Sequence, residues 1–261
     1  FPSAYWLSEK ITAPKIAYAV SAHRTDMGLF RQNLDQVKRI LNSYALIGVR
    51  DEITLKMVQE TGIDEKIEVC KVPDPAFFFS PPPMDTKVLI EKYGIDENRP
   101  LLGLLFYGKP KPASAIYEHY HQKGFQVISF NMYNPYVDLN LGHKVDPYEW
   151  AELFKVLTFC VTDRFHGSVF CIRNNVPFIA IEPRPIKTQA NSKIYDLLYT
   201  FSLLDSYQNT YESDFMLHGF FDRCSHIERK WSQIYSQRIE SELRRQEKIH
   251  QTFSEKIQQV I

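Results

Sequence analysis

Short apolar runs alternate with amphipathic segments along the first third of the chain. The spacing of apolar residues distinguishes the two kinds of segment, because strands are short and β-prone while helices repeat apolar residues every three or four positions. Asp51 can cap a helix and Gly62 can end it. This alternation predicts a parallel sheet with crossover helices. The predicted elements are a strand at 16–22, a helix at 33–41, a strand at 44–50, a helix at 51–62 and a strand at 67–72.

Three consecutive prolines within residues 80–85 interrupt this alternation, and we interpret this stiff segment as a domain boundary. Beyond it the alternation is clearer, and Asp146, Pro147 and Glu149 have the spacing of a helix start with a capping box. Four strands with intervening helices predict a Rossmann-like sheet. The predicted elements are helices at 89–94, 114–124, 146–157 and 165–175, and strands at 101–107, 125–130, 158–163 and 176–182.

The chain therefore reads as α/β with two Rossmann-like domains. Residues 1–80 are expected to be the remainder of an N-terminal domain, 86–224 a C-terminal domain, and 225–261 a helix that packs back on the body. A partner-binding helix is the alternative for this last segment. Its apolar side chains follow a spacing of four, at Trp231, Tyr235, Ile239 and Leu243.

The balance of charges limits the ligands that the whole surface can attract. The chain has 261 residues, of which 44% are hydrophobic, and its 31 basic residues equal its 31 acidic residues. It has no net field to hold nucleic acid or an anionic membrane, so any bound anion must be held by a local cluster.

Cysteine spacing and hydropathy indicate a cytoplasmic, soluble protein. The four cysteines, which form no CxxC pair, are expected to be reduced thiols. No run approaches the roughly 18 apolar residues of a membrane span, and residues 1–10 lack the features of a signal peptide. No metal site is expected, since the histidines at 119, 121 and 143 have no partners at metal-ligand spacing.

The segment at 161–183 carries the strongest chemical signal. An apolar strand ends at Thr162, and Asp163, Arg164, His166 and Gly167 form the turn into a helix. Ligands of open α/β sheets bind at the carboxyl ends of the strands, and a helix N-terminus favours anions. Arginine can grip a carboxylate or phosphate with two hydrogen bonds, and histidine can also transfer a proton. The alternatives are an ion-paired arginine and a structural histidine.

This turn, with the following NNVPFIAI and the preceding DPYEW, resembles the signature of the polysaccharide pyruvyl transferase family. The earlier stretch that runs from YALIGVRDEITL to VPDPAFFF resembles the central segment of the same family. Together the two stretches span about residues 16–200 in the family's order. The resemblance implies two domains of glycosyltransferase-B type, phosphoenolpyruvate as donor, a glycan or lipid-linked sugar as acceptor, and no redox cofactor.

The resemblance also assigns roles to residues. It places Arg50, Arg164, His166, Gly167 and Lys187 around the donor, although Arg184 and Lys193 compete with Lys187 for the same role. His166 is the candidate proton-transfer group, and Asp163 either orients His166 or Arg164 or caps the following helix. Arg50 could instead be a surface ion-pair residue, and Asp74 is expected to organise a turn. Family members usually begin with a glycine-containing strand that this sequence lacks, so the N-terminal domain is expected to be incomplete.

The implied reaction moves the enolpyruvyl unit of phosphoenolpyruvate onto a sugar of a surface polysaccharide, exopolysaccharide or capsule, or of its lipid-linked precursor, as a ketal. Contact with a membrane would come only through a lipid-linked acceptor. Two alternatives stay open. One is a nucleotide-sugar glycosyltransferase, in which Glu182 would hold the ribose, and the other is a non-catalytic carbohydrate-binding protein.

Overall fold

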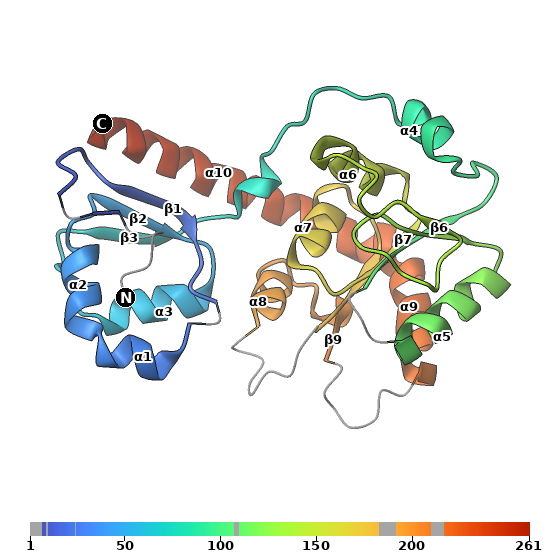
Figure 1. Ribbon diagram of the computed structural model, residues 1–261, viewed down its shortest axis with the longest axis horizontal. Coiled ribbons are helices and arrows are strands. Elements are labelled where there is room, and N and C mark those ends of the chain that lie inside the picture. Colours follow the sequence, from blue (N-terminus) through green and yellow to red (C-terminus); the bar gives the residue numbers. More distant parts are fainter. Residues whose placement is uncertain (1–6, 9, 24, 107–109, 183–191, 210–216) are drawn as a thin grey trace. The chain divides into compact units, whose positions relative to one another are not determined.

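The computed structural model describes residues 7–8, 10–23, 25–106, 110–182, 192–209 and 217–261, and it divides the chain into two compact units (Figure 1). The first unit is Phe1–Pro75 with Glu242–Ile261, and the second is Ala76–Ser241. The sequence-based domain limits, at the prolines of 80–85 and at 225, stay a prediction.

The first unit contains a three-stranded parallel sheet in the order β1-β2-β3. Helices lie between successive strands along the chain, as the alternating pattern predicted. The strands are β1 (Ile16–Val20), β2 (Leu46–Val49) and β3 (Glu68–Lys71), and the helices are α1 (Met27–Gln32), α2 (Leu34–Leu41) and α3 (Glu52–Glu60).

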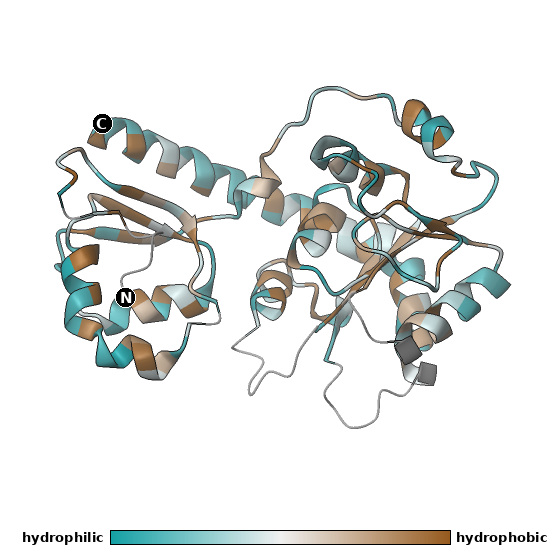
Figure 2. Cartoon of the chain, in the orientation of Figure 1, coloured by the Kyte–Doolittle hydropathy of each residue, from teal (hydrophilic) through white to brown (hydrophobic). Residues whose placement is uncertain are grey.

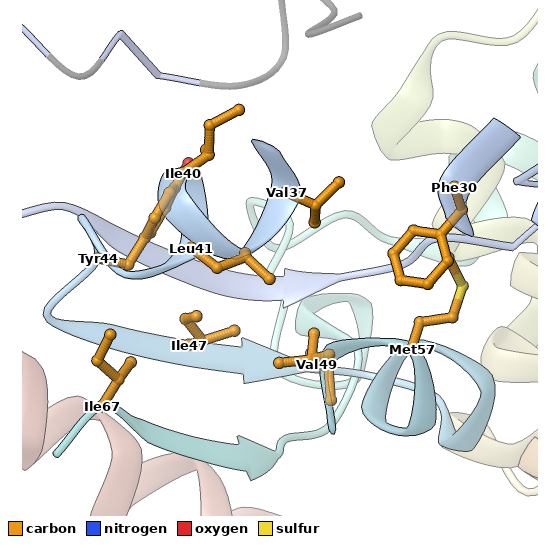
Figure 3. Packing of buried hydrophobic residues seen from close by; sticks show 10 residues of the cluster. Phe30, Val37, Ile40, Leu41, Tyr44, Ile47, Val49, Met57 and Ile67 are labelled. Carbon is orange, nitrogen blue, oxygen red and sulfur yellow. The ribbon is translucent and has the colours of Figure 1, made fainter. Parts of the chain in front are cut away.

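Strand β2 is buried on both faces, because its side chains alternate between two helical layers. Ile47 and Val49 belong to the cluster formed with α1 to α3 (Figure 3). Leu46 faces the opposite way and packs with Phe253 from the C-terminal helix. Gly48 is on that same face, where an added Cβ would lie 2.7 Å from the Phe253 ring. The lack of a side chain at Gly48 therefore lets the C-terminal helix approach the sheet.

The second unit contains a six-stranded sheet in the order β6-β5-β4-β7-β8-β9, and every neighbouring pair is parallel. This is the doubly wound Rossmann order. The short edge strands β6 and β9 were not among the four strands expected from sequence; two-residue strands carry too little periodicity to be recognised. The central strands are buried and largely apolar (Figure 2). The strands are β4 (Leu101–Leu105), β5 (Gln126–Ser129), β6 (Leu139–Asn140), β7 (Phe159–Thr162), β8 (Phe178–Ile181) and β9 (Tyr207–Gln208).

Helices of the second unit mostly follow the predicted positions. The predicted capping box at the start of α6 is present, with reciprocal bonds between Asp146 and Glu149. Short turns of 3-10 helix lie at Pro75–Phe77, Phe154–Val156 and Leu204–Ser206, and a π turn lies at Trp231–Tyr235. The α-helices are α4 (Thr86–Tyr93), α5 (Pro110–Gln122), α6 (Pro147–Leu153), α7 (Phe165–Arg173), α8 (Lys193–Thr200), α9 (Leu217–Lys230) and α10 (Ser236–Val260).

The C-terminal helical segment contributes to both units. Trp231, Tyr235 and Ile239 are buried, and the Trp231 indole donates to the Asn175 carbonyl at 3.0 Å. Helix α10 then continues into the first unit, to which its residues from Glu242 onward belong. Across the described residues, no helix combines the length and apolarity needed to cross a bilayer.

Candidate anion-binding site

The predicted DRFHG turn lies where the winding of the six-stranded sheet reverses. Strands β4 and β7 are neighbours, and the chain continues from β4 toward one edge and from β7 toward the other. In open α/β sheets, ligands bind outside the carboxyl ends of strands at this switch point. The Asp163 amide, directly after β7, donates to the Leu105 carbonyl at the end of β4 at 3.1 Å. Sequence order could not show this position, because it depends on the pairing of β4 with β7.

A buried threonine shapes the turn. The Thr162 hydroxyl accepts a hydrogen bond from the Arg164 amide at 3.0 Å and donates to the Leu105 carbonyl at 3.3 Å. Helix α7 begins at Phe165, so Gly167 lies in its first turn instead of in the preceding loop. A Cβ on Gly167 would lie 2.4 Å from the Thr162 oxygen. Gly167 is therefore required so that the helix can start this close to the end of β7.

Helix α7 starts differently from most other helices in the structure. The N-cap side chains of α1, α3, α4, α6 and α8, which are aspartate or serine, accept bonds from the first amides of their own helices. At α7 the N-cap is Arg164, whose side chain makes no capping bond. Asp163 lies one residue before the cap position. The partial positive charge of this N-terminus is thus joined by a cationic side chain, a combination suited to an anion.

The cationic side chains of the turn are held by their neighbours. Arg164 Nε lies 3.1 Å from the buried Asp163 Oδ1, and Arg164 Nη2 lies 3.1 Å from Met132 Sδ. The Arg164 side chain is 34% exposed, so the guanidinium is oriented by protein contacts and still reaches solvent. His166 is exposed, and its ring centroid lies 5.4 Å from that of Phe165. Asp163 therefore lies in ion-pair contact with Arg164, and the expected roles of Asp163 and His166 in the reaction stay predictions.

Helix α8 brings a second cation to this turn. Lys193 Nζ lies 5.0 Å from the centroid of the Phe165 ring, next to His166 in the chain. Ser192 caps α8 and is bonded to the Glu182 carboxylate that follows β8. Lys187 and its rival Arg184 lie outside the described residues. Three basic residues after β8 are candidates for donor binding. Among them, Lys193 lies within the described residues and contacts Phe165.

Glu182 is part of a buried hydrogen-bond network. It accepts from the Ser192 and Tyr207 hydroxyls, the latter at 3.2 Å. Burial, followed by the nearby Glu182 charge, raises the pKa of Tyr207, so the phenol remains a donor at neutral pH. These bonds join the ends of β8 and β9 to the start of α8, which favours a structural role for Glu182.

Arg50 lies in the first unit, directly after β2. Its guanidinium donates to the carboxylate of Asp74, which is buried. The adjacent Asp51 caps α3 by accepting from the Thr54 amide at 2.8 Å and from its hydroxyl at 2.6 Å. Asp74 is thus an ion-pair partner of Arg50. Its expected role in a turn, and the joint action of Arg50 and Arg164 on one donor, stay predictions.

Asp163 and Arg164 lie between β7 and α7, while His166 and Gly167 lie in the first turn of α7; their joint role in donor binding stays a prediction. The structure adds three residues that sequence reasoning did not assign to the site. Thr162 and Met132 carry no sequence signal for this role, because their contacts depend on tertiary packing. Lys193 had been weighed only as an alternative. The added residues are Thr162, Met132 and Lys193.

Comparison with known proteins identifies both a family and a fold. A family model described as polysaccharide pyruvyl transferase matches residues 2–185. Among solved structures, Anabaena HepE in complex with UDP-glucose is similar at TM-score 0.55 and 13% identity, over 94% of this chain and 72% of that one. Sucrose-phosphate synthase from Thermosynechococcus elongatus is similar at TM-score 0.50 and 12% identity, over 93% of this chain and 64% of that one.

These structural likenesses show a fold of glycosyltransferase-B type with two Rossmann-like parts, as predicted. The chain spans less than two thirds of the sucrose-phosphate synthase chain. Comparison with curated proteins gave no significant match.

Proposed function

Because the chain belongs to the polysaccharide pyruvyl transferase family, we propose that it transfers the enolpyruvyl group of phosphoenolpyruvate to a sugar and closes a pyruvate ketal. The observation that carries this proposal is the DRFHG turn at the sheet's switch point, where a helix N-terminus and Arg164 offer an anion site. The sugar would belong to a surface polysaccharide or to its lipid-linked precursor.

The reaction requires no oxidant or reductant. A proton adds to the methylene carbon of phosphoenolpyruvate, and a sugar hydroxyl forms a C–O bond at the carbon that carries the carboxylate and phosphate. The C–O bond to phosphate then breaks, and a second hydroxyl of the same sugar attacks this carbon. One of the two hydroxyl protons balances the proton taken up by the new methyl group, and the other leaves with inorganic phosphate.

Two requirements of this route, anion binding and proton transfer, have candidates at the junction of β7 and α7. Arg164 and the first turn of α7 would bind the donor's carboxylate or phosphate, since arginine can donate two parallel hydrogen bonds. Lys193 offers a second positive charge beside them. His166, exposed in the same turn, would deliver or remove the proton. Arg50 and Lys187 complete the proposed set of donor-binding cations.

A comparison of ligands in thermal unfolding tests the proposal. A ligand that binds only the native state at about 100 times its Kd stabilises the protein by about 2.7 kcal/mol. Phosphoenolpyruvate is expected to raise Tm, and Arg164→Ala should remove most of the increase. An increase with uridine diphosphate alone would support a nucleotide-sugar glycosyltransferase, and an increase with neutral sugars alone would support a binding protein. Either result would contradict the assignment of phosphoenolpyruvate as donor.

A further inference from the structure

A second polar pocket lies in the same unit, at the end of β9. Its volume is about 540 Å³, within the usual range for small-molecule sites. Strand β9, helix α8, the turn at Leu204–Ser206 and helix α9 supply its walls (Figure 1). Neither the sequence motifs nor the proposed donor site involves this pocket. Its main lining residues are Tyr195, Asp205, Tyr207, Gln208, Arg223 and His226.

Hydrogen bonds hold several of the lining groups in place before any ligand binds. The Tyr235 hydroxyl donates to Asp205 Oδ2 at 2.8 Å, which orients this carboxylate. Arg223 Nη1 donates to the Tyr207 carbonyl at 2.8 Å and to Gln208 Oε1 at 3.0 Å. An ordered set of donors and acceptors reduces the entropy lost when a ligand binds.

The charges in the pocket disfavour a phosphate-bearing ligand. Asp205 and Asp222 both line it, and Arg223 is the only lysine or arginine among the lining residues that the structure describes. This arginine is already bonded to the Tyr207 carbonyl and the Gln208 side chain. Two carboxylates beside one engaged guanidinium would repel a nucleotide diphosphate or phosphoenolpyruvate.

The same groups suit a neutral ligand with many hydroxyls. The carboxylate oxygens of Asp205 and Asp222 can accept bonds from hydroxyl groups. Tyr195 adds aromatic surface, and its ring is held by an edge-on contact with the buried ring of Tyr207, with centroids 5.4 Å apart and planes at 84°. Aromatic rings pack against the C–H faces of sugar rings, and tyrosine adds a polar end.

Only one side of the pocket, at Asn209, lies along the same sheet edge as the donor turn, because Asp205 comes before β9 in the chain. Strands β7, β8 and β9 are consecutive and parallel, so Asn209, after β9, and Asp163, after β7, follow carboxyl ends at one edge. Two strand spacings of about 4.8 Å separate them by roughly 10 Å. Helix α8 connects the two places, because Lys193 contacts Phe165 while Tyr195 lines the pocket.

We propose that this pocket is a saccharide-binding subsite that holds the glycan acceptor, with Tyr195 and Asp205 as its principal contacts. The description of the saccharide as acceptor rests on the proposed function. The proposal that a sugar binds here does not depend on that function, because it is argued from the lining residues alone.

Saturation-transfer NMR with the full chain tests the proposal, using methyl glycosides of glucose, galactose, mannose and N-acetylglucosamine as probes. At least one probe should bind, and Asp205→Asn and Tyr195→Ala should each weaken that binding at least tenfold. Tyr148→Ala is the control: this tyrosine lies in α6, is 45% exposed and does not line the pocket. Its saccharide binding should be unchanged. Thermal unfolding of each variant without ligand would verify that it is folded.

Three results would overturn the subsite. The first is that no probe binds wild-type protein at about 50 mM, well above the millimolar range of weak binding. The second is that the pocket variants bind the probes as well as wild type does. The third is that uridine diphosphate, and none of the sugars, binds in the pocket. Phosphoenolpyruvate binding, measured separately without sugar, keeps the two proposals apart. Saccharide binding without phosphoenolpyruvate binding would retain the subsite and remove only its description as an acceptor site.

Discussion

Helices α7 and α3 both begin just after the carboxyl end of a parallel strand, and an arginine lies at each junction. At α3, the helix N-terminus is occupied by the protein's own carboxylate, since buried Asp51 accepts from both the amide and the hydroxyl of Thr54. At α7, the N-cap is Arg164, and the neighbouring carboxylate of Asp163 pairs with its side chain. The sequence motifs VRDEIT and TDRFHG are superficially alike, with arginine and aspartate in reversed order.

The order of these two residues determines what the helix N-terminus can do. An aspartate in the cap position satisfies amides of the first turn and stabilises the helix. When arginine takes that position, the dipole and the side chain both favour an external anion. The α7 turn is therefore suited to ligand binding, and the α3 turn to stability. Five substitutions test this difference.

The largest effect is expected at His166, the proton-transfer candidate of the α7 turn. His166→Gln should lower kcat about 100-fold or more while keeping phosphoenolpyruvate affinity within about tenfold, because it removes an acid/base group without removing charge-binding groups. Steady-state kinetics and donor titration would measure this. His121→Gln, at an exposed histidine of α5, is the control and should leave kcat unchanged. Full turnover and affinity in His166→Gln would exclude His166 from the site.

Arg164→Lys should mainly weaken donor binding, by roughly ten- to a hundredfold, because lysine keeps the charge but loses the planar fork. Calorimetric titration with phosphoenolpyruvate would measure the change. If affinity stayed at the wild-type value, Arg164 would be only an ion-pair partner of Asp163.

Gly167→Ala should destabilise the protein by about 1–3 kcal/mol, because the new methyl group would overlap the Thr162 oxygen. The double variant Thr162→Ala/Gly167→Ala should recover part of this loss in denaturant unfolding. Gly219→Ala, in helix α9 where nothing lies within 4 Å of an added Cβ, should be neutral or stabilising by up to about 1 kcal/mol. Equal losses for the single and double variants would reject the proposed overlap.

Asp51→Ala should reduce the free energy of unfolding by about 1–2 kcal/mol, the usual range for loss of an N-cap. Because Asp51 serves the α3 helix itself, phosphoenolpyruvate affinity should stay unchanged. If Asp51→Ala instead caused a large loss of phosphoenolpyruvate affinity with an unchanged free energy of unfolding, the start of α3 would serve ligand binding and not helix stability.

The smallest change in the free energy of unfolding is expected at the capping box of α6, where the Asp146 and Glu149 carboxylates accept hydrogen bonds from backbone amides at the helix start. Burial alone would raise the pKa of Glu149, but hydrogen bonds from Lys92 and Tyr93 outweigh it and lower the pKa overall. A lowered folded-state pKa means that the stabilisation is present above the ordinary carboxyl pKa and is lost as pH falls through the folded value. Glu149→Gln should therefore cost about 1 kcal/mol at pH 7 and less near pH 3, measured by urea unfolding. A pH-independent difference would contradict this account.

Local patterns alone were sufficient to predict much of the fold. The caps Asp51 and Asp146 act on backbone amides within their own helices, so their roles can be recognised from neighbouring residues. The apolar runs of β2, β4, β7 and β8 predict buried strands for the same reason. Strands β6 and β9 are only two residues long, and their pairing with neighbours defines them more than their composition does.

The sequence by itself determined the order of the longer strands and most helices, the family, and the closeness of Asp163, Arg164, His166 and Gly167, because these depend on residues close together in the chain. Tertiary structure alone decided that β7 pairs with β4, which places this turn at the switch point. It also brought Met132 to Arg164, Lys193 to Phe165, and α8 beside β9 to form the second pocket. These contacts join residues distant in sequence, and they arise only when the sheet forms and the helices pack on it.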